Sequence, residues 1–255
     1  MIGYRDRIIR ALARRMMRKY EPGVIAVTGE TGQLLQERAV GKILRNVRDI
    51  RMESRAFGES MALPVTVLSE NRRGEGAWFW LRMIADAWWR TIVRHPYPEL
   101  LVVGCRARSH DDAARFLEIA RPQITVVTGS DDAASYRAAP LVEALPSNGY
   151  GIMDCDGKGA AILAKYTRAH VTTFGFAEGA AMRITNFKMD AEGVSFALEY
   201  GGKTALMQIS GARSKNVASA AAGAACVGIA FGMNLQRIAS FLRDLETGEE
   251  SIAAE

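Results

Sequence analysis

The stretch Val24-Ile25-Ala26-Val27-Thr28-Gly29-Glu30-Thr31-Gly32 decides the fold expected for this chain. Its first five residues form a short apolar run rich in β-branched side chains, which predicts a buried strand. The two glycines then supply a turn, and the periodicity from about Leu34 to Arg45 predicts a helix. A strand, a glycine turn and a helix in this order are typical of the opening of a phosphate-binding α/β domain.

Strands and helices are expected to alternate through most of the remaining chain. Apolar runs predict strands at 62–68, 100–103, 124–128 and 171–176, and a turn at 146–149 leads into the run 150–153. Helical periodicity predicts helices at 75–94, 111–120, 136–145, 214–230 and 235–245. The short alternating segments 182–189, 193–200 and 204–209 predict an antiparallel meander. The expected fold class is therefore α/β, with a doubly wound, mainly parallel sheet and a small antiparallel extension.

The composition excludes several classes of protein. Hydrophobic residues make up 49% and charged residues 24% of the 255 residues, which excludes a mainly disordered chain. No apolar run approaches the roughly 18 residues of a membrane-spanning helix, and the charged N-terminus lacks the apolar core of a secretory signal. The three cysteines and three histidines show no metal-binding spacing, which argues against disulfides and zinc and indicates a cytoplasmic setting.

The positive charge of the chain belongs to its N-terminal segment. The net charge is +5, and residues 1–20 contain seven cationic side chains against Asp6 alone. Apolar residues within 5–19 recur at helical spacing, so residues 1–22 are expected to form a basic amphipathic helix. Such a helix either docks on its own domain or lies on a partner or an anionic membrane, which would make the cytoplasmic protein peripheral to the membrane. Charge confined to one helix does not indicate a nucleic-acid-binding surface.

The domain organisation follows from these patterns. Residues 1–22 precede one large α/β domain at 23–245, in which the meander occupies about 181–209. Residues 246–255 form an acidic tail that is expected to fray.

Tryptophan is concentrated in the predicted helix at 75–94. Its four tryptophans predict packing in the core or at an interface rather than a ligand pocket, and Leu81, Ile84, Ala85, Trp88 and Ile92 make an apolar stripe. This helix and the basic N-terminal helix are the expected interaction surface, through Arg7, Arg14, Arg18, Trp78, Trp80 and Trp89. A protein partner or a second copy of the chain is the expected occupant.

Several segments resemble, in the same order, those of the Mur ligases, the ATP-dependent enzymes that add amino acids to the UDP-N-acetylmuramoyl peptide of the cell wall. Beside the opening stretch they are ESMALPVTVL at 59–68, YPELLVVG at 97–104, RPQITVVTG at 121–129, LVEALPSNGYGIMDCD at 141–156, HVTTFGF at 170–176 and GMNLQRIASFL at 232–242. They resemble the central ATPase domain, most nearly that of the D-alanyl-D-alanine-adding ligase, over residues 18–245. The resemblance implies the central-domain fold, and no sequence is expected here for the family's N-terminal UDP-binding and C-terminal domains.

The phosphate loop of the family reads G-x-x-G-K-[ST], and this chain departs from it. Gln33 stands where the resemblance implies the phosphate-binding lysine, and Leu34 where it implies the hydroxyl that binds Mg²⁺. Glu30 adds a negative charge where a triphosphate would lie. Of the family's adenine-binding pattern only Asn216 remains. The expected remnant of a nucleotide site is Gly29, Thr31, Gly32, Gln33 and Asn216.

The metal-binding positions that the resemblance implies are also changed. The metal-binding glutamate of the family falls at Gly104 or Cys105, and the carbamylated lysine falls at Ala138. In the segment Phe57-Gly58-Glu59 only the carboxylate of Glu59 matches the family's Asn-Asn-Glu. No catalytic residue, metal site or cofactor is therefore expected, and the favoured interpretation is a pseudoenzyme with a degenerate phosphate loop.

Three functions remain open at this point. The favoured one is a non-catalytic domain that binds a protein partner or another copy of itself and is linked to peptidoglycan synthesis. The second is an ATP-dependent carboxylate–amine ligase or nucleotide binder, using ATP and Mg²⁺, that a partner subunit completes. The third is a new site in which Cys105 and His110 form a nucleophile pair, against the simpler interpretation of a buried cysteine and a surface histidine.

Four carboxylates near strand ends have simpler expected roles than metal binding. Asp111 and Asp112 are expected to be charges at a helix N-terminus, and Asp154 and Asp156 are expected to form a turn.

Overall fold

Residues 4–29, 32–53, 59–69, 76–107, 109–129, 132–243 and 245 are described by the computed structural model. The strands found in them are β1 (Gly23–Gly29), β2 (Ile50–Met52), β3 (Leu100–Gly104), β4 (Ile124–Thr128), β5 (Tyr150–Asp154), β6 (His170–Gly175), β7 (Met182–Met189), β8 (Gly193–Tyr200) and β9 (Lys203–Ser210). The helices are α1 (Tyr4–Tyr20), α2 (Gln33–Leu44), α3 (Glu59–Leu68), α4 (Ala77–Ile92), α5 (His110–Leu117), α6 (Asp132–Glu143), α7 (Gly159–Leu163), α8 (Lys215–Ala230) and α9 (Leu235–Leu242).

All of these strands join one sheet, in the order β2-β3-β1-β4-β5-β6-β7-β8-β9. Neighbouring strands are parallel from β2 through β7, and β8 and β9 extend the sheet in antiparallel fashion. The strand order reverses at β1, which lies between β3 and β4. In open α/β sheets such a switch point leaves a crevice at the carboxyl ends of the strands. The fold class predicted from the sequence is confirmed, and the start of α2 lies where a ligand site is expected.

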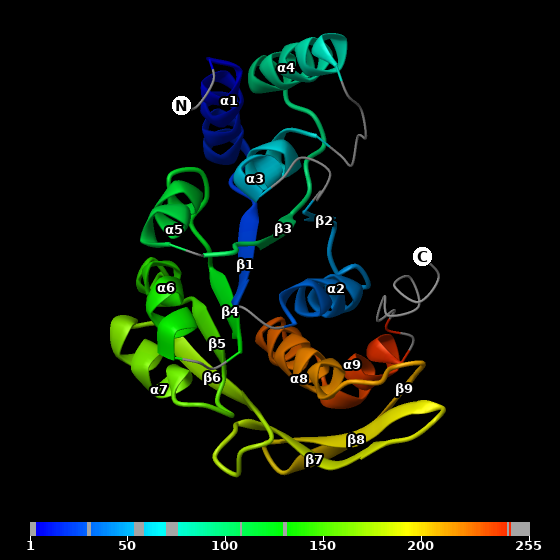
Figure 1. Ribbon diagram of the computed structural model, residues 1–255. Coiled ribbons are helices and arrows are strands. Elements are labelled where there is room, and N and C mark those ends of the chain that lie inside the picture. The colour runs from blue at the N-terminus through cyan, green and yellow to red at the C-terminus, as the bar shows by residue number, and fades with distance from the viewer. Residues whose placement is uncertain are drawn as a thin grey trace.

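Helices cover both faces of the sheet, as Figure 1 shows. Successive residues of a strand point to opposite faces. Ile25 of β1 therefore packs with α2, α8 and α9, whereas Val24 and Ala26 pack with α1, α3 and α5. Helices α6 and α7 enclose a third cluster, around Val127 and Met153. Burial on both faces explains why the central strands are unbroken apolar runs.

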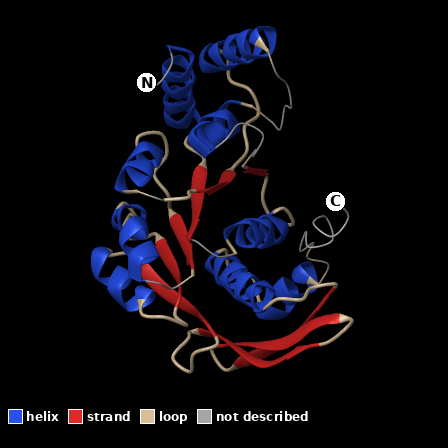
Figure 2. Cartoon of the chain, in the orientation of Figure 1, coloured by secondary structure: helices blue, strands red, loops and turns tan. Residues whose placement is uncertain are grey.

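The antiparallel meander follows the prediction closely. Tyr200 of β8 pairs with Lys203 of β9 across the two-residue turn Gly201-Gly202, whose φ angles are 54° and 74°. Positive φ at both central residues is typical of the tight type I′ hairpin turn, which favours glycine. Figure 2 shows this extension at one end of the sheet, and α8 and α9 pack against its strands.

The strand predicted at 62–68 is wrong, because these residues belong to helix α3. Every side chain from 61 to 69 is buried, so the segment lacks a polar face and its periodicity cannot distinguish a helix from a strand. A carbonyl group at the end of this helix accepts hydrogen bonds from two side chains that are distant in the sequence. Arg51 Nη1 and the Tyr97 hydroxyl donate to the Val67 carbonyl at 3.1 and 2.8 Å. These tertiary contacts override the strand preference of its β-branched residues.

Other differences from the predicted elements are small. The short elements β2 and α7 were not expected, and α6 begins at Asp132 rather than at residue 136. The predicted acidic tail, 246–255, lies outside the described residues.

Candidate functional site

The turn between β1 and α2 requires the two glycines that the sequence singles out. Gly29 has a φ of 141°, and a Cβ atom there would overlap the carbonyl oxygen of Thr128 on β4. Gly32 has a φ of 74° and is the N-cap of α2, which it cannot cap with a side chain. The first turn of α2 therefore begins without the side-chain acceptor that is usual at such a start. Thr31 lies outside the described residues.

The start of α2 lies between two hollows. The smaller has a volume of about 60 Å³ and is lined by Gly32, Asn216 and Asp154, with further residues from the ends of β4 and β6 and from α8. The larger has a volume of about 330 Å³, and Gln33 is one of its lining residues. The structure thus brings Gly32 and Asn216 together, whereas the Gln33 side chain lines a different hollow.

Gln33 turns toward Glu37, one helical turn further along α2. Its Nε2 donates to Glu37 Oε1 at 3.0 Å, and both side chains are buried. The Gln33 Oε1 has no hydrogen-bond partner among the described residues. A buried amide oxygen without a donor costs about 1–3 kcal/mol, so a water or a ligand N–H would be stabilised at this atom.

Gly104, at the end of β3, is packed against this pair. A Cβ atom at Gly104 would overlap Glu37 Oε1 and Gln33 Nε2, so a larger residue fits only if these side chains move. The Gly104 N–H donates to the carboxylate of Glu53, which follows β2. Gly104, one of the two positions that can match the family's metal-binding glutamate, is therefore bordered by the carboxylates of Glu37 and Glu53. Their location was not predictable from the sequence, because it depends on β2 and α2 meeting beside β3.

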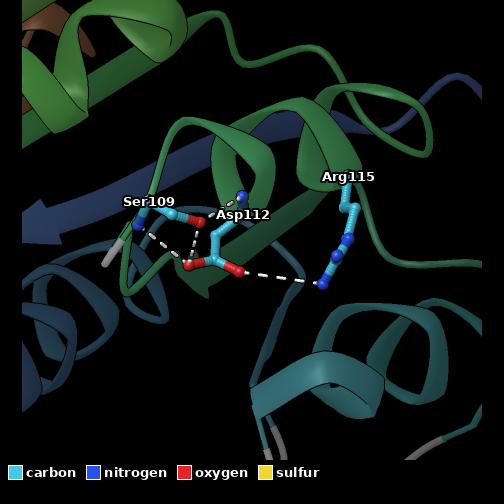
Figure 3. A network of polar contacts seen from close by, with 3 residues as sticks. All are labelled: Ser109, Asp112 and Arg115. Atoms are coloured by element: carbon cyan, nitrogen blue, oxygen red, sulfur yellow. Dashed lines mark hydrogen bonds and ion pairs between the residues drawn. The ribbon is translucent and has the colours of Figure 1, made fainter.

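Arginines from α1 and from the region of α5 also line the larger hollow, namely Arg10, Arg106 and Arg115. Arg115 Nη1 pairs with Asp112 Oδ1 at 3.9 Å (Figure 3). Asp112 also closes a capping box at the start of α5, since Asp112 Oδ2 accepts from Ser109 N at 3.0 Å and Ser109 Oγ accepts from Asp112 N at 3.3 Å. Asp112 therefore helps to cap the N-terminus of α5, and its predicted place at the start of a helix is confirmed.

Two carboxylates form turns, which is their predicted role: Asp154 is the last residue of β5, and Asp156 follows the strand. Asp154 Oδ1 accepts from the Asp156 N–H at 2.9 Å, and Asp156 Oδ1 accepts from the N–H groups of Phe176 and Ala177 at 2.6 and 2.8 Å. Asp156 thereby ties the loop after β5 to the loop after β6. Burial raises the pKa of Asp154, whose carboxyl group lies beside the smaller hollow.

Cys105 lacks the chemistry expected of a nucleophile. Its thiol is buried, and burial raises its pKa to about 12, with a further increase from the carboxylates of Glu53 and Asp112. Because the thiolate is the reactive form, such a group is inert near neutral pH. The side chain of His110, its hypothesised partner, lies outside the described residues.

We expect a thiol-specific reagent at about pH 8 to label Cys155 in the folded protein well before Cys105 and Cys226. Cys155 is partly exposed, whereas the other two thiols are buried; burial raises the pKa of all three thiols, and it does so most strongly for Cys105 and Cys226. Mass spectrometry of peptides after timed labelling measures the order, and labelling in urea is the control in which the three rates converge. Rapid labelling of Cys105 in the folded chain would contradict this arrangement.

Of the remaining positions that the resemblance implies for Mg²⁺, Ala138 and Leu34 have apolar side chains that cannot bind a metal ion. Ala138 is buried within α6, and Leu34 is an apolar residue in the first turn of α2. The backbone of Glu59 begins α3, but its side chain lies outside the described residues. Within the described ranges, no three His, Cys, Asp or Glu side chains are grouped so that they could hold a metal ion.

Most of the predicted interaction surface is exposed. On α1 the exposed members are Arg7, Arg14 and Arg18, and on α4 they are Trp78 and Trp89. Trp80 differs, because it is half-buried against the core and the Arg5 guanidinium lies 4.4 Å from its ring centroid. No helix in the described part of the chain has the length and apolar character to span a membrane.

Comparisons with known proteins place this geometry in context. No protein-family model matches the chain. The chain is 24% identical over 158 residues to the UDP-N-acetylmuramoyl-tripeptide–D-alanyl-D-alanine ligases of Mycobacterium bovis and Mycobacterium tuberculosis, a match that covers 58% of this chain and 26% of theirs.

Solved structures resemble the whole described fold. The MurF ligase of Thermotoga maritima in complex with ADP matches with a TM-score of 0.74 at 16% identity, over 97% of this chain and 53% of that one. A UDP-N-acetylmuramoylalanyl-D-glutamyl-2,6-diaminopimelate–D-alanyl-D-alanyl ligase of Acinetobacter baumannii matches with a TM-score of 0.71 at 16% identity, over 95% and 50% of the two chains. The chain thus spans about a quarter of the length of its curated relatives and half that of these ligases. Its parallel sheet, switch point and antiparallel extension are the fold of the Mur ligase central domain.

Proposed function

We propose that this chain is a Mur ligase-fold domain of peptidoglycan synthesis that does not catalyse ATP-driven ligation by itself and acts by binding a protein partner. The observation that carries the proposal is the packing of Gln33, Glu37 and Gly104 at the start of α2. The link to peptidoglycan rests on the curated ligases and the MurF structures that the chain resembles.

The start of α2 lacks the cation that a triphosphate in a catalytic position requires. Phosphoryl transfer needs cations around the γ-phosphate, but Gln33 is neutral and already donates to Glu37. Glu37 and Glu53 both line the hollow that Gln33 faces. Two like unit charges about 4 Å apart repel by roughly 4 kcal/mol at an effective dielectric constant near 20. Arg10, Arg106 and Arg115 line the same hollow and offset part of this repulsion, so what the site lacks is a cation at the position of Gln33 itself.

Two of the positions implied for metal ligands, Gly104 and Ala138, are closely packed by their neighbours. A side chain at Gly104 would require Glu37 and Gln33 to move and to break their present contact. Ala138 is buried in the cluster formed with Val142, Leu145 and Met153, where a charged side chain would be costly. The surroundings of both positions are adapted to the small residues present, which supports a role other than metal-assisted catalysis.

A specific observation favours a second candidate, a nucleotide binder or ligase that a partner subunit completes. Gly32 keeps its left-handed conformation, and Asn216 lies beside it in the smaller hollow. Backbone N–H groups at the start of a helix bind phosphate, so this side of α2 offers a place for an anion. In this alternative the partner supplies the lysine and the metal ligands.

The purified chain is expected to release no phosphate from ATP and Mg²⁺ above the background rate. The double variant Gln33→Lys/Leu34→Thr is expected to remain inactive, because the introduced ammonium would pair with Glu37 and the metal ligands would still be missing. Phosphate release and binding of ATP, measured by calorimetry, check both statements. Tight binding without turnover would favour the second candidate.

A matched pair of loop variants separates true turnover from contamination. Gly32→Pro and Gly202→Pro each place proline at a φ of 74°, but Gly202 lies in the β8–β9 turn, far along the chain from α2. Phosphate release by the wild-type chain that Gly32→Pro abolishes and Gly202→Pro retains would overturn the proposed function.

A further inference from the structure

Helix α4 has a second apolar face that is open to solvent. Its inner face is buried through Met83, Ala87 and Thr91. The outer face consists of residues spaced by one or two helical turns. They are Trp78 (76% exposed), Leu81 (58%), Trp88 (55%), Trp89 (53%) and Ile92 (54%). A helix docked on a domain needs one apolar stripe. The second stripe, with three tryptophans, is therefore not explained by the packing of this domain.

Helix α1 packs against α4, with contacts near both ends of the two helices. Near the beginning of both helices, the Arg5 guanidinium lies over the Trp80 ring, and near their ends Lys19 Nζ donates to the carbonyl oxygens of Arg90 and Val93 at 2.9 Å. Figure 1 shows the two helices at one end of the molecule, away from the antiparallel extension. Arg5 and Leu81 line the same shallow depression, so the outer stripe of α4 adjoins the basic helix.

The aromatic–arginine face consists of the outer stripe of α4 and of the exposed Arg7, Arg14 and Arg18, which lie on the side of α1 opposite its buried residues. Helices α1 and α4 together contain nine cationic side chains and two carboxylates, Asp6 and Asp86, and each carboxylate is paired with an arginine. The whole chain has a net charge of only +5, so the rest of it is slightly acidic. The positive charge of the protein is concentrated where its exposed tryptophans are.

The charge decides between the possible occupants of this face. A symmetric dimer would place the same patch of each copy against the other and bring the arginines together. An anionic surface instead complements them, because guanidinium groups bind phosphates well. Tryptophan favours the boundary between headgroups and acyl chains, and a helix with an apolar and a basic side can lie in that plane.

We propose that the aromatic–arginine face docks the protein on an anionic lipid surface, with the tryptophans at headgroup depth and the arginines on lipid phosphates. The inference goes beyond the proposed function and does not depend on it, since α4 and the exposed arginines are not part of the hollows beside α2.

The full chain is expected to sediment with vesicles of equimolar phosphatidylglycerol and phosphatidylcholine, and to remain in solution with vesicles of phosphatidylcholine alone. Tryptophan emission is expected to shift to the blue on binding, because all four tryptophans of the chain lie on α4. Binding is expected to weaken steeply between low and high salt, since exposed charges are screened beyond about 10 Å at 0.1 M salt.

Two variants test the two components of the face. Trp78→Ala/Trp88→Ala is expected to weaken partitioning to the anionic vesicles by about tenfold or more, because both indoles are lost from the interface. Arg7→Glu/Arg14→Glu/Arg18→Glu is expected to weaken it by about 100-fold or more, because three cations become anions. All five side chains are exposed, so the variants should keep the wild-type melting temperature.

Matched variants elsewhere are expected to bind as the wild type does. Tyr136→Ala/Leu206→Ala removes two other exposed apolar side chains, and Lys188→Glu/Lys203→Glu/Arg243→Glu makes the same change in net charge away from α1 and α4. Equal losses in the face and control variants would overturn the proposal. So would the absence of binding to anionic vesicles, a dimer that Trp78→Ala/Trp88→Ala dissociates, or capture of an acidic polypeptide without any binding to lipid.

Discussion

Replacing Gly104 with glutamate is expected to lower the free energy of unfolding by roughly 3 kcal/mol or more. A side chain at Gly104 would overlap Glu37 and Gln33, and the introduced carboxylate would lie beside the carboxylates of Glu37 and Glu53. Overpacking and like-charge repulsion therefore act in the same direction. Urea denaturation followed by circular dichroism measures the loss.

A control and a second variant make this test specific. Gly179→Glu adds the same side chain at a glycine with open space around it, and its effect is expected to stay within about 0.5 kcal/mol. Combining Gly104→Glu with Gln33→Lys is expected to recover part of the loss, since a cation would then lie among the carboxylates. If Gly104→Glu is as stable as Gly179→Glu, the site is free to accept the family's residue, and the main support for a non-catalytic domain is lost.

Truncation of Phe174 to alanine is expected to lower the free energy of unfolding by about 3–5 kcal/mol. Phe174 is the largest side chain among the fully buried ones, with 0% of its surface exposed, and it lies in the core between the sheet and α2, α8 and α9. Removing its ring leaves a cavity that these elements cannot close without moving. The midpoint of urea denaturation, with the slope of the transition unchanged, reports the effect.

A second phenylalanine provides the comparison. Phe241 of α9 is only partly buried, with the Arg237 guanidinium 5.5 Å from its ring centroid, so Phe241→Ala is expected to cost about 1 kcal/mol. Equal losses for the two variants would indicate that the core around Phe174 relaxes when the ring is removed.

The fold was predictable where local pattern and burial agree. The strands of the central sheet are apolar on both faces, and β9 of the meander alternates between buried and exposed residues after a tight glycine turn, so both gave clear signals. Helix α3 was not predictable, because a fully buried helix of ten residues has no polar face and depends on Arg51 and Tyr97, which are distant in the sequence. The three-residue strand β2 was not predictable because its conformation depends on pairing with β3, which is distant in the sequence.

The candidate site was predictable in its positions and not in its contacts. The phosphate-loop pattern aligns Gly29 and Gly32 and identifies Gln33 as a departure from its lysine, and the structure places Gly32 beside Asn216. The direction of the Gln33 side chain, and its bond to Glu37, depend on what fills the end of β3. The motif indicates which residues are present. The direction of their side chains depends on how α2, β2 and β3 pack together.

The alanine-rich side of α8 has a consequence for how this site can change during evolution. A Cβ atom at Gly223 would lie 2.6 Å from Gln36 Oε1, and Gln36 Nε2 donates to the Ala220 carbonyl at 3.1 Å, so small residues set the spacing of α2 and α8. Asn216 is carried on the first turn of α8, and Gly32 starts α2. A larger residue two turns away would act as a wedge between the helices and widen the hollow without altering any residue that lines it. Substitutions at positions remote from the hollow can therefore widen or narrow it. The width of the hollow can change during evolution while the residues that line it stay the same.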